Sequence, residues 1–269
     1  MPGPWQRWRR WKEARTLKRR PIPEALWRAT LDRYPFLGWR TTAEQERLRE
    51  LATLFLAAKE FSGAGGLDVT DAMAVAIAAQ ACLPVLELGL DRYAGFVGIV
   101  VHPDAVAARR EITDDDGVVH EYVEELSGEA MEGGPLMLSW RDVAEAGESA
   151  AWGYNVVIHE FVHVLDLHAG RRGLPAGTGG ASWVEQLGAI YDDFVARVDA
   201  GEDTLLDPYG AEAVEEFFAV AAEVFFVAPQ DLLDEEPDLY ALLRVFFRQD
   251  PAAGLRETSP GASRDAAGA

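Results

Sequence analysis

The sequence predicts an α+β domain that is mainly helical and carries a small mixed sheet. Several windows repeat apolar residues with the 3.6-residue period of a helix, and shorter runs rich in β-branched and aromatic residues lie between them. No break in composition separates two cores between residues 35 and 250. At 269 residues, the chain is long enough for one sizeable hydrophobic core.

The first half of the chain is expected to interleave helices with strands. We expect helices at about 42–61 and 70–82, and strands at 96–101 (FVGIVV) and 118–123 (VVHEYV). A further strand is expected at 135–140 (PLMLSW), after a pair of glycines. We interpret it as the edge of the sheet, where free backbone amides and carbonyls can pair with an added strand.

The segment 154–167 is dense in apolar side chains and predicts a buried helix. Asn155 is its expected cap, and Gly170 is its expected stop. The helix carries the sequence HEFVH, with His159 and His163 four positions apart. Such positions share one helix face, so both imidazoles can reach a single metal ion. Imidazole nitrogens suit zinc, whose catalytic sites use three protein ligands and a water.

Glu160 follows the first histidine and can accept the proton of a zinc-bound water. Because zinc lowers the pKa of that water to about 7, a carboxylate base is enough to generate a nucleophile at neutral pH. Such a site hydrolyses amides. The alternative is two core histidines bonded to carbonyls. We favour the metal, because a buried imidazole pair without a partner is costly.

The third ligand is expected on a second helix, at 209–227, which ends before Pro229. Glu212, Glu216 and Glu223 return to nearly the same face of that helix at spacings of four and seven. A carboxylate on so apolar a helix needs a strong partner, and zinc would be one. Spacing alone does not choose between Glu216 and Glu223.

Four segments together resemble the Mlc titration factor A family of zinc-dependent peptidases. They are HEFVHVLD at 159–166, YGAEAVEEFFAVAAEVFF at 209–226, RPIPEALWRATLDRYPFL at 20–37 and GPLMLSWRDV at 134–143. The resemblance covers most of the chain, from about Arg20 to Pro251. The helix pair is also similar to the catalytic domain of anthrax lethal factor. The resemblance implies a zincin-type metallopeptidase domain with its sheet beside the active-site helix.

The resemblance also implies residue roles. It implies one Zn²⁺ per chain, held by His159, His163 and Glu216, with Glu160 as general base and acid. It places Tyr209, seven residues before the third ligand, as a donor to the developing oxyanion. From its neighbours alone, Tyr209 is an ordinary turn residue between a proline and a glycine.

Two further acids are expected around the ligands. Asp166 shares the face of His159 and can orient a ligand imidazole, or bind Arg171 or a nearby backbone group. With Glu216 on the metal, Glu223 becomes either an orienting acid or a buried hydrogen-bonding group. The remaining histidines are expected to lie outside the site: His102, His120 and His168.

Two functions follow from these expectations. The first is an aminopeptidase acting on short peptides, as the resemblance implies; it needs an acid for the substrate ammonium, and Glu212, Glu215 and Asp166 are candidates. The second is a regulatory protein that binds and titrates a transcriptional repressor of sugar uptake, the Mlc repressor, with peptidase activity secondary. The two functions can coexist.

Three regions are expected along the chain. They are a basic N-terminal arm at 1–20, a single zinc metallopeptidase domain at 21–251 and a disordered, small and polar tail at 252–269. The net charge of the chain is −20. The arm contributes +7, so residues 21–269 together carry −27. So acidic a body argues against nucleic acid as a partner.

The arm places three tryptophans among its arginines, Trp5, Trp8 and Trp11. This pattern can form a basic helix that touches an acidic membrane or nucleic acid, but we favour a disordered or loosely docked arm. The single cysteine, Cys82, permits no internal disulfide and is expected to be buried. No apolar secretory core follows the basic residues, and polar residues and a proline interrupt the apolar window 72–90, so we expect a cytoplasmic protein without a transmembrane segment.

Overall fold

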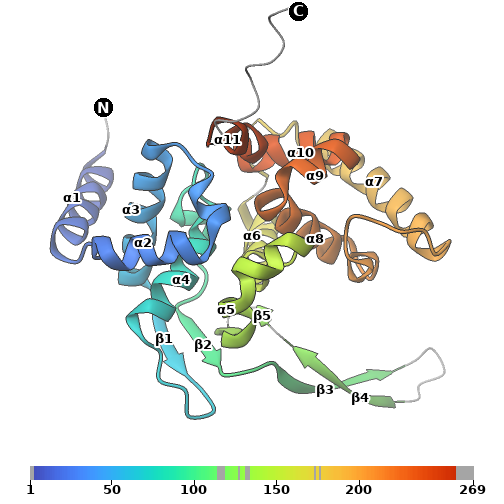
Figure 1. Cartoon of the computed structure of the whole chain (residues 1–269), viewed down its shortest axis with the longest axis horizontal. Helices are drawn as coiled ribbons and strands as arrows, with labels where there is room; N and C mark the ends of the chain where they lie inside the picture. Colours follow the sequence, from blue (N-terminus) through green and yellow to red (C-terminus); the bar gives the residue numbers. More distant parts are fainter. Residues whose placement is uncertain are drawn as a thin grey trace, which may run out of the picture.

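Helices form most of the fold, and a small sheet lies along one side of them (Figure 1). The computed structural model describes residues 3–113, 119–126, 128–130, 134–172, 174–175 and 177–258; within 106–130, 166–172 and 256–258 it describes the backbone alone. The helices are α1 Pro4–Arg19, α2 Glu24–Arg33, α3 Thr42–Ala58, α4 Asp71–Cys82, α5 Trp140–Ser149, α6 Val156–Arg172, α7 Ala181–Asp199, α8 Val214–Val227, α9 Pro229–Glu235, α10 Pro237–Phe247 and α11 Pro251–Thr258. Short 3-10 turns lie between them: η1 Pro35–Gly38, η2 Leu90–Tyr93, η3 Ala150–Trp152 and η4 Pro208–Ala211. The predicted α+β, mainly helical class is confirmed.

The main sheet is mixed and has the strand order β1-β2-β6-β5 in the described chain. Its strands are β1 Glu60–Gly63, β2 Gly98–His102, β6 Leu136–Ser139 and β5 Gly128–Ala130. The first three are parallel, and β5 pairs antiparallel with β6. A separate antiparallel ribbon joins β3 Val106–Thr113 to β4 Val119–Leu126.

The strand predicted at 135–140 is not an edge strand. It forms β6, which lies between β2 and β5, and Trp140 already belongs to α5. Leu136 and Leu138 are buried, and Met137 on the opposite face is partly buried. A strand that is apolar on both faces is typical of the interior of a sheet, so the prediction of an edge was wrong. The edge on this side is β5, a strand that was not predicted from the sequence.

Three predicted helices form close to their expected positions, as α3, α4 and α6. Thr41 and Thr70 cap α3 and α4 with their side chains. Asn155 caps α6 by accepting the backbone N–H of Ile158 at 2.9 Å. The stop expected at Gly170 was wrong, because α6 continues to its end at Arg172. A glycine inside a helix costs only about 1 kcal/mol, which does not end a helix held by its neighbours.

The helix predicted at 209–227 is two elements rather than one. Tyr209 lies on η4, and α8 begins only after Ala213, which is extended with φ −157° and ψ 156°. The proline and glycine around Tyr209 favour the turn. As a result, Tyr209 and Glu212 do not share a helical phase with Glu216.

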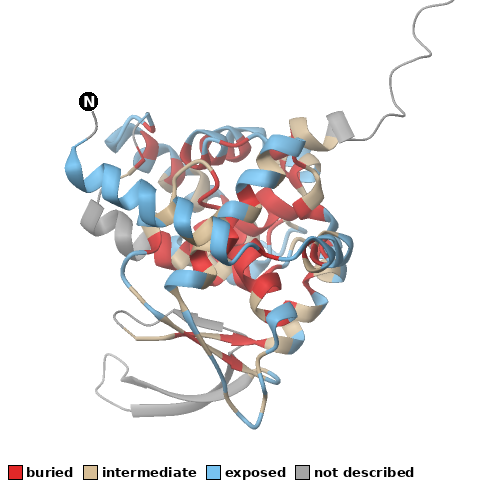
Figure 2. Cartoon of the chain, turned by 90° about the vertical axis from the view of Figure 1, so that its left-hand side faces the viewer, coloured by how far each residue is buried: buried red, intermediate tan, exposed pale blue. Residues whose placement is uncertain are grey.

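The central pair of helices is α6 and α8, and the buried residues gather around it (Figure 2). Phe161 of α6 is fully buried, and its ring centroid lies 5.5 Å from that of Phe55, 5.0 Å from Tyr93 and 5.8 Å from Phe96. On α8, every residue from Phe217 to Val227 is buried. Burial of each large apolar side chain contributes about 1.5–3 kcal/mol, so the two helices form a rigid base for side chains between them.

The two ends of the described chain are helical. Residues of the basic arm form α1, which lies beside α3 and has no buried residue (Figure 1). This arrangement is compatible with a loosely docked arm, which stays a prediction. At the other end, α11 covers the first residues of the expected tail, and Ala252 is buried; residues 259–269 lie outside the described chain. No described helix combines the length and apolar character that crossing a membrane requires.

Candidate metal centre

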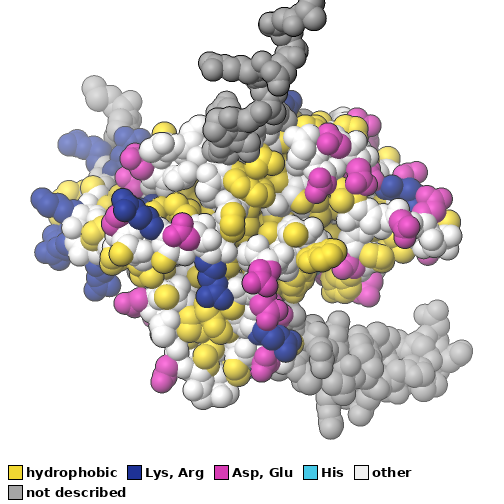
Figure 3. Space-filling view, in the orientation of Figure 1, with side chains coloured by type: hydrophobic (Ala, Val, Ile, Leu, Met, Phe, Trp, Pro, Cys, Tyr) yellow, Lys and Arg dark blue, Asp and Glu magenta, His cyan; other side chains and the backbone are white. Residues whose placement is uncertain are grey.

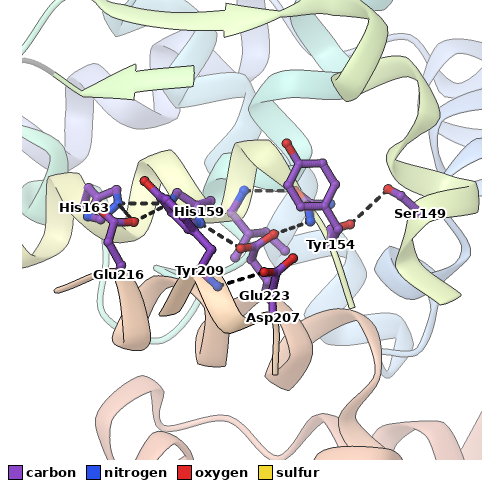
Figure 4. Close-up of polar contacts among 10 residues, drawn as sticks. Ser149, Tyr154, His159, His163, Asp207, Tyr209, Glu216 and Glu223 are labelled. Carbon is purple, nitrogen blue, oxygen red and sulfur yellow. Dashed lines mark hydrogen bonds and ion pairs between the residues drawn. The ribbon is translucent and has the colours of Figure 1, made fainter. Parts of the chain in front are cut away.

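Two histidines of α6 and one glutamate of α8 converge on a common point (Figure 4). His159 Nε2 and His163 Nε2 lie 3.0 Å apart, and Glu216 Oε2 lies 3.1 Å from the first and 3.2 Å from the second. The four-residue spacing puts both rings on the face of α6 that meets α8. Among described residues, these three form the one cluster of His, Cys, Asp and Glu side chains whose ligand atoms could hold a metal ion.

The donor set of this cluster fits zinc. Tetrahedral bonds of about 2.0–2.1 Å separate ligand atoms by about 3.3 Å, which is close to the three distances observed. Two imidazole nitrogens and one carboxylate oxygen are donors of catalytic zinc sites, which keep a fourth position open. Burial opposes ionisation of Glu216, but hydrogen bonds from His159 and His163 lower its pKa to about 2. The carboxylate is therefore charged, as a metal ligand must be.

Glu223 holds the opposite side of the His159 ring. His159 Nδ1 lies 2.7 Å from Glu223 Oε1 and donates its proton to that carboxylate, so Nε2 faces Glu216. A carboxylate behind a ligand imidazole fixes the tautomer and the ring orientation. Burial would lower the pKa of His159, but the carboxylates of Glu223 and Glu216 raise it to about 10. A metal ion must therefore displace a proton from this ring.

A buried chain of hydrogen bonds anchors Glu223. Its second carboxylate oxygen accepts the backbone N–H of Asn155. The Asn155 side chain donates from Nδ2 to Gln80 Oε1 at 2.8 Å, and Gln80 Nε2 donates to the carbonyl of Ala76 at 3.2 Å. Glu223 is 2% exposed, and Asn155 and Gln80 are 0% exposed. The chain links α8, α6 and α4, so three helices fix the orientation of His159.

Glu160 is buried beside the two histidines. It is 6% exposed, and its Oε2 has no hydrogen-bond partner in the described chain. Burial raises the pKa of Glu160 to about 7, while the neighbouring imidazoles of His159 and His163 act in the opposite direction. A carboxyl group with a pKa near neutrality is suited to take up and return a proton.

Tyr209 reaches the cluster from η4. Its ring centroid lies 6.2 Å from that of His159, and Figure 4 shows it alongside His159 and Glu216. Asp207 Oδ1 accepts the backbone N–H of Tyr209 at 2.9 Å, which fixes the turn. The Tyr209 side chain is 39% exposed, so it forms part of the site's open rim.

The other predicted acids and histidines do not join the cluster. Glu212 and Glu215 are exposed, just before α8 and in its first turn. Asp166 lies on α6, but its side chain is outside the described residues. Of the histidines expected to lie outside the site, His102 ends β2 away from the ligand group; the side chains of the other two are not among those described, namely His120 and His168.

Two residues that support the cluster, Gln80 and Asp207, were not predicted from the sequence, and the contacts of Asn155 were predicted only in part. Gln80 is a lone amide in an otherwise apolar window, and a buried amide needs a partner, which was a signal of its role. Asp207 precedes a proline, which is typical of a residue that starts a turn. Asn155 was expected as a cap, but its contacts with Glu223 and Gln80 join helices far apart in the chain and leave no mark in the local sequence.

Comparison with known proteins identifies a metallopeptidase family and several relatives. Residues 6–248 match the family of glucose-regulated metallo-peptidases M90. A protein of Synechocystis sp., itself uncharacterized, is 35% identical over 91% of this chain and 90% of its own length. The Mlc titration factor A of Cronobacter sakazakii is 33% identical over 91% of this chain and 93% of that protein. The Mlc titration factor A of Pectobacterium atrosepticum is 35% identical over 86% of this chain and 88% of that protein.

Proposed function

Because the chain belongs to the family of glucose-regulated metallo-peptidases M90, we propose that it is a zinc-dependent peptidase in which Glu160 activates the attacking water. The convergence of His159 Nε2, His163 Nε2 and Glu216 Oε2 is the observation that carries this proposal. When bound, zinc supplies Lewis acidity that lowers the pKa of water and polarises the substrate carbonyl. The chain's own residues then handle the proton and the developing charge.

Glu160 takes the proton of the water and returns it to the leaving amine. Its place next to His159, its burial and its unpaired Oε2 support this role. A base that is shielded from water keeps its proton affinity for the reacting group. Tyr209, beside the His159 ring, donates its phenol proton to the oxygen that gains charge in the transition state.

The peptide binds as an added strand along β5. In the described chain β5 is the edge of the main sheet next to α6, so its outer backbone groups are the ones available to a substrate strand. Glu212 and Glu215, which are exposed around the start of α8, are candidates to hold the ammonium of an aminopeptidase substrate. A panel of free-amino and N-blocked peptides tests this preference: an aminopeptidase cleaves the free-amino set, and equal cleavage of both sets would contradict it.

The mechanism is tested by Glu160→Gln. This variant keeps the shape of the side chain but removes the base, so zinc should stay bound while the turnover of short peptides falls by about 10²–10⁴-fold. Glu145→Gln, an exposed change on α5, is the matched control and should keep full turnover. Unchanged turnover in the Glu160 variant would refute the proposed role of this residue.

The name Mlc titration factor A, given to several relatives, favours a second function. In this function the chain binds a transcriptional repressor of sugar uptake in the cytoplasm, and peptidase activity is secondary. Glu160→Gln separates the two functions. If that variant lacks turnover but still binds the repressor and keeps the cellular effect, regulation is the main function; if it loses the cellular effect, proteolysis is.

A further inference from the structure

We propose that α1 is a docking surface for membranes that carry anionic lipids. The three tryptophans of α1 are exposed to solvent: Trp5 is 79% accessible, Trp8 51% and Trp11 56%. No residue of α1 is buried against the rest of the chain. Exposed apolar side chains that cluster together, unlike those scattered singly over a surface, mark an interaction site.

The three rings form one stripe that faces away from the body of the protein. At about 100° per residue, Trp5, Trp8 and Trp11 span about 120° of the helix circumference. The partly covered residues of α1 are centred about 130° from the middle of this stripe; they are Glu13, Thr16 and Leu17. The helix rests beside α3 (Figure 1), and its exposed tryptophans lie away from its partly covered face.

Cations lie within the same stripe. Lys12 Nζ is 4.6 Å from the ring centroid of Trp8, and Arg15 Cζ is 5.3 Å from that of Trp11. Trp5 packs edge-on against Trp8 at 5.8 Å. Figure 3 shows Lys and Arg gathered at this end of the molecule, while Asp and Glu spread over the rest. Tryptophan favours the headgroup level of a membrane, and Lys and Arg near the surface are attracted to anionic lipids, so this mixture of side chains suits an anionic membrane.

A lipid surface fits α1 better than nucleic acid does. Bases stack on open aromatic faces, but Lys12 and Arg15 cover one face of Trp8 and of Trp11. The body beyond the arm carries −27 and repels any polyanion that extends past α1. α1 is about 24 Å long and can lie flat on a planar membrane surface. The acidic body then stays outside the membrane, and salt screens its repulsion from anionic lipids at distances beyond about 8–10 Å.

Co-sedimentation of the full chain with vesicles tests the proposal. The protein should bind vesicles of equal parts phosphatidylcholine and phosphatidylserine, should not bind pure phosphatidylcholine, and should dissociate in high salt. The triple variant Trp5→Ala, Trp8→Ala, Trp11→Ala and the double variant Lys12→Glu, Arg15→Glu should each weaken binding at least about tenfold. Trp152→Ala is the matched control, because Trp152 is 86% exposed but lies outside α1, and it should bind as wild type does.

The fluorescence of the bound protein gives a second readout. Tryptophan emission should shift to shorter wavelength on binding to the mixed vesicles, and the shift should disappear in the triple variant. Failure to bind the mixed vesicles, or equal binding by wild type and the triple variant, would overturn the proposal. Tighter binding to duplex DNA or RNA than to these vesicles would overturn it in favour of a nucleic-acid partner.

Discussion

The two glutamates of α8 that contact His159 hold opposite sides of its ring. Glu216 lies at Nε2, where it converges with His163, and Glu223 lies at Nδ1. Their seven-residue spacing brings both onto one helix face, which is why helical phase reduced the candidates to this pair but could not choose between them. Only the position of the imidazole between them separates a metal ligand from an orienting acid.

Tyr209 gives a prediction at the same scale. Tyr209→Phe removes the phenol proton but keeps the ring beside His159, so zinc should stay bound while kcat falls by about 10²–10³-fold. Steady-state kinetics with one short peptide measure the change. Tyr154→Phe, at another partly exposed tyrosine near the site, should keep most of the activity; loss of zinc from the Tyr209 variant would show that the ring has a structural role instead.

At the scale of elements, the sequence was most informative where a helix starts and is buried. Apolar residues at helical period predicted α3, α4 and α6 close to their observed positions, and Asn155 was also predicted as the cap of α6. The break before α8 was missed because Val214 and the residues after it have the same helical composition as those before.

The chain of hydrogen bonds across α4, α6 and α8 gives a prediction for these elements. Gln80→Leu removes the acceptor of Asn155 Nδ2, and a buried donor left unsatisfied costs about 1–3 kcal/mol. The melting temperature should fall, and zinc affinity should fall by up to about tenfold because Asn155 also supports Glu223.

Ile77→Leu is the control for this chain of contacts. It conserves volume at another fully buried position of α4, so it should cost less than about 1.5 kcal/mol and leave zinc affinity unchanged. Equal zinc affinity in the Gln80 and Ile77 variants would contradict a link from α4 to the metal ligands.

At the scale of the whole molecule, the fold class was predictable from the sequence, but the order of the strands in the main sheet was not. Alternating helices and short strands indicated an α+β domain, and the mixed sheet was confirmed. The edge was misassigned because β5 has three residues, too few to leave a period-2 pattern, so nothing in the sequence indicated a strand outside β6. The order of strands is a long-range property that no local pattern encodes.

Metal removal gives a prediction for the whole molecule. A ligand at about 1,000 times its Kd stabilises the folded state by about 4 kcal/mol, and each kcal/mol shifts the melting temperature of a chain this long by about 2–4 °C. Zinc at about 1,000 times its Kd, added to protein from which a chelator has removed the metal, should therefore raise the melting temperature by about 8–16 °C, measured by calorimetry. Glu216→Gln should show little of this shift; a full shift in that variant would place the stabilising ion elsewhere.

The zinc content of purified variants tests the central claim most directly. Wild type should bind one zinc per chain. Glu216→Gln should lose the metal, and Glu223→Gln should keep it with about 10–100-fold lower affinity, because Glu223 orients His159 without touching the ion. Glu215→Gln, next to the proposed ligand but exposed, is the matched control and should bind as wild type does. Loss of zinc from the Glu223 variant with full retention in the Glu216 variant would contradict the assignment of the metal centre.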